Sequence, residues 1–296
     1  MLQSTTTSTD MVFSIDLETF LDKAERNIRR VDNRLDDYIK NPNEENIHNI
    51  RTAIRRLQAT YISLSKKIRK KKNIREFVIK SKELFRINSK IRDYDIISEK
   101  LSKDVQSSHQ QQNIELLQKL LKSQRKRMLN KAKRIALELS KISVPKLRDS
   151  DISQNKLEKR INSIANKFAD RIKKNFPIVV ANSQKIRELH EMRKDCKKLR
   201  YLMELLPENE SNSKNKISHM IKELEKVQNM LGIIHDYDTT IAYLRHQKRK
   251  QSIKTIIEKI ANIRQDKYEQ FVLYYKGERA DTSDSSLFFT QGSTHE

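Results

Sequence analysis

HNIRTAIRRL at residues 48–57 and HEMRKDCKKL at residues 190–199 are two copies of one pattern, 142 positions apart in a chain of 296 residues. Both begin with His, place Arg three residues later, and end in two cations and Leu. On a helix with 100° per residue, the cations share the face of the His, and the apolar residues lie opposite. Each segment therefore predicts an amphipathic helix with one basic face and one core face.

The same register continues along the chain. The Asp-Tyr-Asp triplets at 93–95 and 236–238 are 143 positions apart, and Lys122 and Arg125 align with Arg264 and Lys267 at 142. We interpret this register as the duplication of a four-helix unit, with one half at 14–143 and the other at 152–276, joined near Pro145. Segments 1–13 and 277–296 are expected to be disordered tails.

The fold class is predicted to be all-α. Apolar residues recur every three or four positions, and only three Gly are available for tight turns. Four prolines (Pro42, Pro145, Pro177 and Pro207) are expected to mark helix ends. The expected helices cover residues 17–40, 44–71, 74–103, 112–142, 153–175, 182–206, 214–246 and 250–276.

Composition excludes several classes of protein. The first 231 residues contain no Gly, which excludes the glycine-rich loops of dinucleotide and P-loop sites. The single cysteine, Cys196, is expected in the core and excludes an internal disulfide and a zinc site built from Cys. No stretch of about 20 uncharged residues predicts a membrane span, and no signal peptide is recognised. We expect a cytoplasmic protein without membrane contact.

The net charge of +23 favours a polyanionic partner. No acidic residue at helical spacing neutralises the cations of the first basic face, so a bound anion would relieve their mutual repulsion. A histidine among cations should bind a proton less readily until an anion is present. The candidate anion-binding residues on the two faces are His48, Arg51, Arg55 and Arg56, and His190, Arg193, Lys194, Lys197, Lys198 and Arg200.

These segments, together with Leu231-Gly232-x-x-x-Asp236, resemble the two halves of a CHAD domain, the histidine-containing α-helical domain, over residues 14–276. The resemblance implies two antiparallel four-helix bundles about a pseudo-two-fold axis, a basic central channel, and binding of inorganic polyphosphate. It assigns that binding to the residues above except Lys194, and more weakly to Lys122, Arg125, Arg264 and Lys267. Gln58 and Asn88-Ser89 depart from the family pattern, so the first half is expected to bind less tightly.

The predicted function is therefore non-catalytic binding of inorganic polyphosphate and related polyanions, with no cofactor and no metal. The sequence offers no activated nucleophile, metal cage or pair of poised carboxylates, so no enzyme is expected. The Asp pairs are expected to form ion pairs or helix caps, or to orient residues of the basic faces. Three alternatives remain: a nucleic-acid-binding protein, an enzyme that processes polyphosphate or triphosphates with His48 or His190, and a scaffold on polyphosphate granules that uses the Leu287–Phe289 tail.

Overall fold

The computed structural model describes residues 11–105, 110–206, 213–247 and 253–281. Within these residues the chain is helical and contains no strand, which confirms the predicted all-α class. The helices are α1 (Leu17–Lys40), α2 (Glu44–Ser63), α3 (Lys66–Arg69), α4 (Lys72–Asp104), α5 (Gln111–Leu139), α6 (Gln154–Ala181), α7 (Ile186–Met203), α8 (Ser213–Arg245) and α9 (Lys254–Asp281), with a 3₁₀ turn at Asp149–Asp151. None of the described helices is long and apolar enough to cross a membrane.

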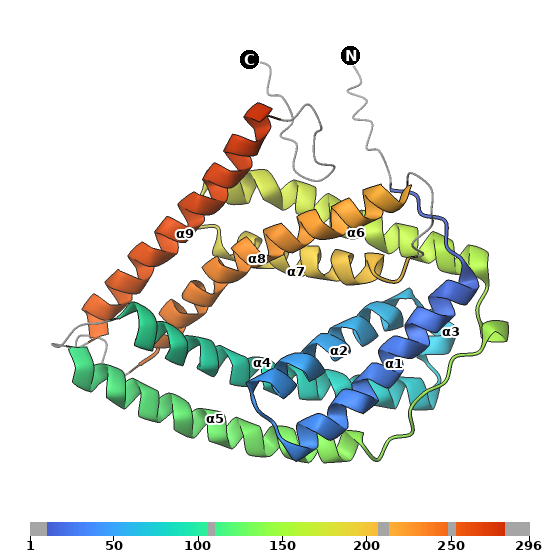
Figure 1. Ribbon diagram of the computed structural model, residues 1–296, viewed down its shortest axis with the longest axis horizontal. Coiled ribbons are helices and arrows are strands. Elements are labelled where there is room, and N and C mark those ends of the chain that lie inside the picture. The colour runs from blue at the N-terminus through green and yellow to red at the C-terminus, as the bar shows by residue number, and fades with distance from the viewer. Residues whose placement is uncertain (1–10, 106–109, 207–212, 248–252, 282–296) are drawn as a thin grey trace.

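The helices pack mainly against their neighbours in the chain. In the first group α1 contacts α2, α2 contacts α4, α4 contacts α5, and α5 returns to α1; in the second group α6, α7, α8 and α9 pack in succession (Figure 1). The hydroxyl of Tyr268 on α9 donates to the carbonyls of Val179 and Val180 on α6. The groups meet where α2 contacts α7 and α4 contacts α8, so the two His-Arg segments lie at the junction.

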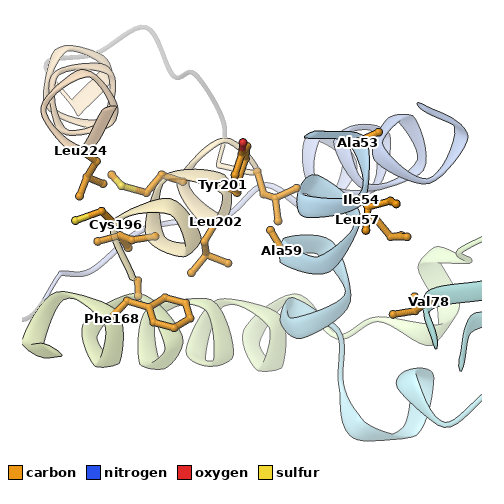
Figure 2. Packing of buried hydrophobic residues seen from close by; sticks show 14 of the residues in the cluster. Ala53, Ile54, Leu57, Ala59, Val78, Phe168, Cys196, Tyr201, Leu202 and Leu224 are labelled. Atoms are coloured by element: carbon orange, nitrogen blue, oxygen red, sulfur yellow. The ribbon is translucent and has the colours of Figure 1, made fainter. Parts of the chain in front are cut away.

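The core consists of the apolar faces predicted by helical periodicity. Ala53, Ile54 and Leu57 of α2 and Cys196 and Leu202 of α7 are buried, and Figure 2 shows them turned into the packed interior. A second apolar cluster joins the far ends of α4, α5, α8 and α9 and includes Ile97, Leu101, Leu117, Leu121, Tyr237, Ile241, Leu244, Ile256 and Ile260. Apolar burial therefore holds the two groups together on both sides of the basic faces.

The expected single helix over residues 44–71 is wrong, because the chain breaks after Ser63. Leu64 is extended, and the hydroxyl of Ser65 accepts a hydrogen bond from the backbone NH of Ile68, which starts the short helix α3. Such a side-chain cap satisfies a donor that the first turn of a helix leaves free. The basic residues at positions 66–72 thus lie on α3, on the two residues that follow it, and at the start of α4.

Pro177 does not end its helix as expected, since α6 continues to Ala181. Proline removes one backbone hydrogen bond, to the carbonyl four residues earlier. Pro177 lies on the exposed side of α6, where water can hydrate that carbonyl. The following helix is correspondingly shorter than predicted, at Ile186–Met203 instead of 182–206.

The prediction of disordered tails is wrong for residues 11–13 and 277–281. Residues 11–13 are packed on α6, because the backbone NH groups of Met11 and Phe13 donate to the side-chain oxygens of Asn166 and Asn162. At the other end α9 extends to Asp281. Residues 1–10 and 282–296, which include Leu287–Phe289, lie outside the described residues, as does Pro207.

Candidate functional site

Four cations from α2 and α7 converge at the junction of the two helix groups. Arg51 and Arg55 come from α2, and Arg193 and Lys197 from α7; we call these four residues the central basic cluster. Burial and the neighbouring positive charges lower the pKa of Arg51 to about 10 and that of Lys197 to about 6. The charge of Arg55 contributes to both shifts and also lowers the pKa of Arg193. Charges from the two helix groups therefore act on one another directly.

The local sequence explains this convergence. On α2, Ile50, Ala53, Ile54 and Leu57 are buried, and on α7, Met192, Cys196 and Leu199 are buried. Each helix therefore turns its apolar stripe into its own group and leaves the opposite, basic face for the other group. The side chains that the periodicity placed on the face of each His thus point toward the junction.

The guanidinium groups of this cluster have few partners within the protein. None of the four cations forms an ion pair in the described part of the chain, and the Nε atoms of Arg51 and Arg193 are buried without a hydrogen-bond partner. The guanidinium carbons of Arg51 and Arg55 lie 5.7 and 5.3 Å from the centre of the Phe85 ring on α4. Stacking on an aromatic ring fixes an arginine while leaving its N–H groups free for an oxyanion.

Two aspartates, Asp93 and Asp236, interact electrostatically with the central basic cluster. Burial raises the pKa of Asp93 on α4 and of Asp236 on α8, while Arg51 and Arg193 act in the opposite direction. The two carboxylates also repel one another, which adds to the rise at Asp93. They therefore offset only part of the positive charge of the cluster.

The second aspartate of each triplet forms an ion pair with an arginine of the next helix in the chain. The Nε atom of Arg125 lies 2.5 Å from Asp95, and that of Arg264 lies 2.9 Å from Asp238. Arg125 therefore corresponds to Arg264, 139 positions later, and the predicted alignment of Arg125 with Lys267 is wrong by three residues. The stretch between aspartate and arginine spans 30 residues in the first case and 26 in the second, which accounts for the slip.

The histidines differ between the two groups of helices. His190 faces His235 of α8, with 3.2 Å between their Nδ1 atoms and 4.4 Å between ring centres. Burial and the charges of Arg193 and other cations lower the pKa of His235 to about 3, so it is neutral at pH 7. His48 is exposed, and partial loss of hydration together with the charges of Arg51, Arg55 and Arg92 lowers its pKa.

Sequence reasoning missed the contribution of two of these residues, Arg92 and His235. Each directly precedes an Asp-Tyr-Asp triplet, at Asp93 and Asp236, so the register that matched the triplets also pairs Arg92 with His235. That correspondence was the signal available in the sequence.

The other predicted residues lie outside the central basic cluster, and most of them have partners. Arg56 and Arg200 bind the carboxylate of Glu204 at 2.8 and 3.0 Å, and both lie over the ring of Tyr201. Lys198 and Arg171 approach Asp195. The remaining placements are Lys194 at 3.5 Å from Glu191, Lys267 bonded to Gln270, Lys122 exposed on α5, and Arg264 buried.

Possible metal ligands do not gather in the described residues. No group of three or more His, Cys, Asp or Glu side chains there is arranged to hold an ion. Instead, the Asp residues pair with arginines or face them, as the sequence pattern predicted for at least one Asp of each triplet.

Comparison with known proteins identifies the family of this all-helical chain. The family model of the CHAD domain matches residues 22–245, so the chain belongs to the CHAD domain family. The crystal structure of the CHAD domain from the plant Ricinus communis is similar, with a TM-score of 0.52 and 15% sequence identity over 91% of this chain and 90% of that chain. At this identity the similarity concerns the fold alone. No curated protein matches the chain.

Proposed function

We propose that the central basic cluster binds inorganic polyphosphate and that the protein acts without catalysing a reaction. The observation that carries this proposal is the convergence of Arg51, Arg55, Arg193 and Lys197, contributed by both helix groups and unpaired within the described residues. Arginine forks match the paired oxygens of a phosphate, and lysine adds point charge.

An extended polyanion fits this arrangement better than a single phosphate. The cations come from two helices that cross the junction, so a chain of phosphates can contact both groups at once. We also propose that the two groups are duplicated bundles related by a pseudo-two-fold axis, as the shared positions of the His-Arg segments, the triplets and the Arg125 and Arg264 pairs suggest. Binding of this kind suits a cytoplasmic protein associated with polyphosphate granules.

The test is a titration with polyphosphate, orthophosphate and duplex DNA at about 150 mM salt. A variant with Arg51→Gln and Arg193→Gln should lose most of its affinity for polyphosphate and retain its helicity. A matched control, Lys126→Gln with Arg127→Gln on the exposed face of α5, removes the same positive charge and should bind almost as well as the parent chain.

Each alternative predicts a different outcome. Binding of DNA as tightly as polyphosphate at this salt concentration would favour a nucleic-acid-binding protein. Release of phosphate from polyphosphate or triphosphate in the presence of Mg²⁺ would establish an enzyme. Equal losses in the R51Q/R193Q variant and the control would show that only the overall charge matters, and the proposed site would be wrong.

A further inference from the structure

A second group of cations lies near the end of α2. The ring of Tyr61 has the Arg69 guanidinium of α3 at 5.7 Å and the Lys82 ammonium of α4 at 4.9 Å from its centre. Arg160 of α6 is tied to the same region, because its Nε donates to the carbonyl of Ile62 at 2.8 Å. We call Arg69, Lys82 and Arg160 the distal basic cluster.

This cluster resembles the central one in that its cations have no ion-pair partner among the described residues. The Nε atom of Arg69 is buried without a hydrogen-bond partner. Burial and the charge of Arg69 lower the pKa of both Lys82 and Arg160, and no carboxylate opposes these shifts. Glu83, the residue next to Lys82, binds Lys80 instead. Two cations without an ion-pair partner thus lie over the Tyr61 ring, and a third, Arg160, is held at the adjacent residue Ile62.

One face of α4 connects the two clusters. Lys82, Phe85, Ser89 and Arg92 follow one another at steps of three, four and three residues, which places them along a single line of the helix that we call the α4 stripe. The α4 stripe meets α2 at three points: Lys82 at Tyr61, Phe85 at Arg51 and Arg55, and Arg92 near His48. From Lys82 to Arg92 it extends about 15 Å at 1.5 Å per residue. Glu44 reaches only its outer end, 4.0 Å from Arg92.

The second helix group lacks this continuation. The residues 143 positions after Lys82 and Phe85 are Glu225 and Gln228 on α8, and the residue 142 positions after Tyr61 is Met203. Glu225 lies 3.7 Å from Arg200, whose guanidinium also binds Gln228 and Glu204. Where the first group presents an unpaired lysine, the second presents a carboxylate in an ion-pair network.

We infer that a long polyphosphate chain leaves the central basic cluster along the α4 stripe, beside α2, and ends on the distal basic cluster. This inference rests on the proposed function, because the central basic cluster must bind the chain first. The α4 stripe and Tyr61 of α2 offer cations and two aromatic rings along one side of the first helix group, whereas the matching path in the second group is neutralised. The footprint is therefore one-sided, and only a chain longer than the central site can fill it.

The test compares tripolyphosphate with long-chain polyphosphate on the full protein. Arg69→Gln with Lys82→Gln removes two distal cations and keeps the Arg160 bond to Ile62. We expect this variant to bind the long chain at least about tenfold more weakly, while its affinity for tripolyphosphate is unchanged. The dependence of log K on log salt for the long chain should also become shallower, by about 0.7 for each phosphate that the variant no longer neutralises, as for a single-stranded nucleic acid. The K126Q/R127Q control should show neither effect.

The other outcomes separate the two proposals. If the parent chain binds the long polymer and R69Q/K82Q binds it as tightly as the control does, the distal site is wrong and the central site stands. A loss of tripolyphosphate affinity equal to that of the long chain would also overturn the inference, because the distal cations would then belong to the primary site. If the parent chain binds neither polymer, the proposed function itself fails. Circular dichroism and thermal unfolding of each variant confirm that the helices remain folded.

Discussion

Replacement of Lys197 by Met tests how much strain the central basic cluster imposes on the ligand-free protein. Burial and the charges of Arg193, Arg55 and Arg51 lower the pKa of Lys197 from 10.5 to about 6, with Asp236 opposing them. Between these two pH values the unfolded chain carries the proton and the folded chain does not. Folding then releases a proton, so the free energy of unfolding decreases as the pH falls from 10.5 to about 6.

The expected change in unfolding free energy follows from the difference between the working pH and the ordinary pKa of lysine. One pH unit corresponds to about 1.4 kcal/mol, and pH 7 is about 3.5 units below 10.5. Wild-type Lys197 therefore costs up to about 5 kcal/mol of folding free energy at pH 7 and about 2 kcal/mol at pH 9. Met keeps the length of the side chain and removes the charge, so Lys197→Met should stabilise the ligand-free protein by up to these amounts while weakening its binding of polyphosphate.

The assay is urea unfolding of the ligand-free protein at pH 7, 8 and 9, followed by circular dichroism. The gain in unfolding free energy should shrink by about 1.4 kcal/mol for each unit of rising pH. Lys126→Met, at an exposed position on α5, is the control and should change stability by less than about 0.5 kcal/mol. A Lys197→Met variant that is less stable than wild type, or whose gain is the same at all three pH values, would refute the reasoning.

Three further predictions concern other parts of the site. The affinity for polyphosphate should rise as the pH falls from 8 to 6, by up to about tenfold per unit for each proton taken up, because a bound anion favours charged Lys197; calorimetry in buffers of different ionisation enthalpy counts these protons. Asp238→Asn should cost about 3 to 5 kcal/mol in chemical unfolding, since it leaves buried Arg264 without a counter-charge; a loss below about 1 kcal/mol would contradict this. Gly232→Ala should stabilise α8 by roughly 0.5 to 1 kcal/mol, because Ala has a higher helix propensity than Gly. The added methyl group would lie 3.5 Å from Arg193 Nε, an ordinary contact, so the affinity should not change. A lower melting temperature would show that the space is too small.

The sequence predicted the features that depend on local periodicity. The helices that begin at residues 17, 44 and 111 lie within one residue of their predicted starts, and α2 and α7 each bury the apolar face that the His-Arg segments predicted. These features follow from the alternation of apolar and charged residues within a few turns. Such a pattern is complete within one helix, so no knowledge of the neighbouring helices is needed.

Features that depend on contacts distant in the sequence were not predictable in this way. The register between α5 and α9 failed because the connections that precede Arg125 and Arg264 differ by four residues. Equally, nothing near Arg56 shows that Glu204, 148 positions away, neutralises it. A single sequence indicates which face a cation occupies, but the carboxylate that meets it is set by the packing of whole helices.

The distribution of carboxylates therefore gives the basic faces their different roles. The sequence pattern placed Arg56, Arg200 and Lys198 on the same faces as Arg51 and Arg193. In the structure Arg56 and Arg200 connect α2 and α8 with the end of α7 through Glu204 and Glu225, and Lys198 shares Asp195 with Arg171 of α6. Of the cations on the two predicted basic faces, Arg51, Arg55, Arg193 and Lys197 have no ion-pair partner among the described residues, and these four lie at the junction. Departures from the family pattern at Gln58 and Asn88-Ser89 predicted weaker binding by the first helix group. Lys82, however, lies where the second group has Glu225, and it gives the first group the longer series of cations. The departures predict weaker binding of long polyphosphate by the first helix group and Lys82 predicts stronger binding, and the R69Q/K82Q variant decides between these outcomes.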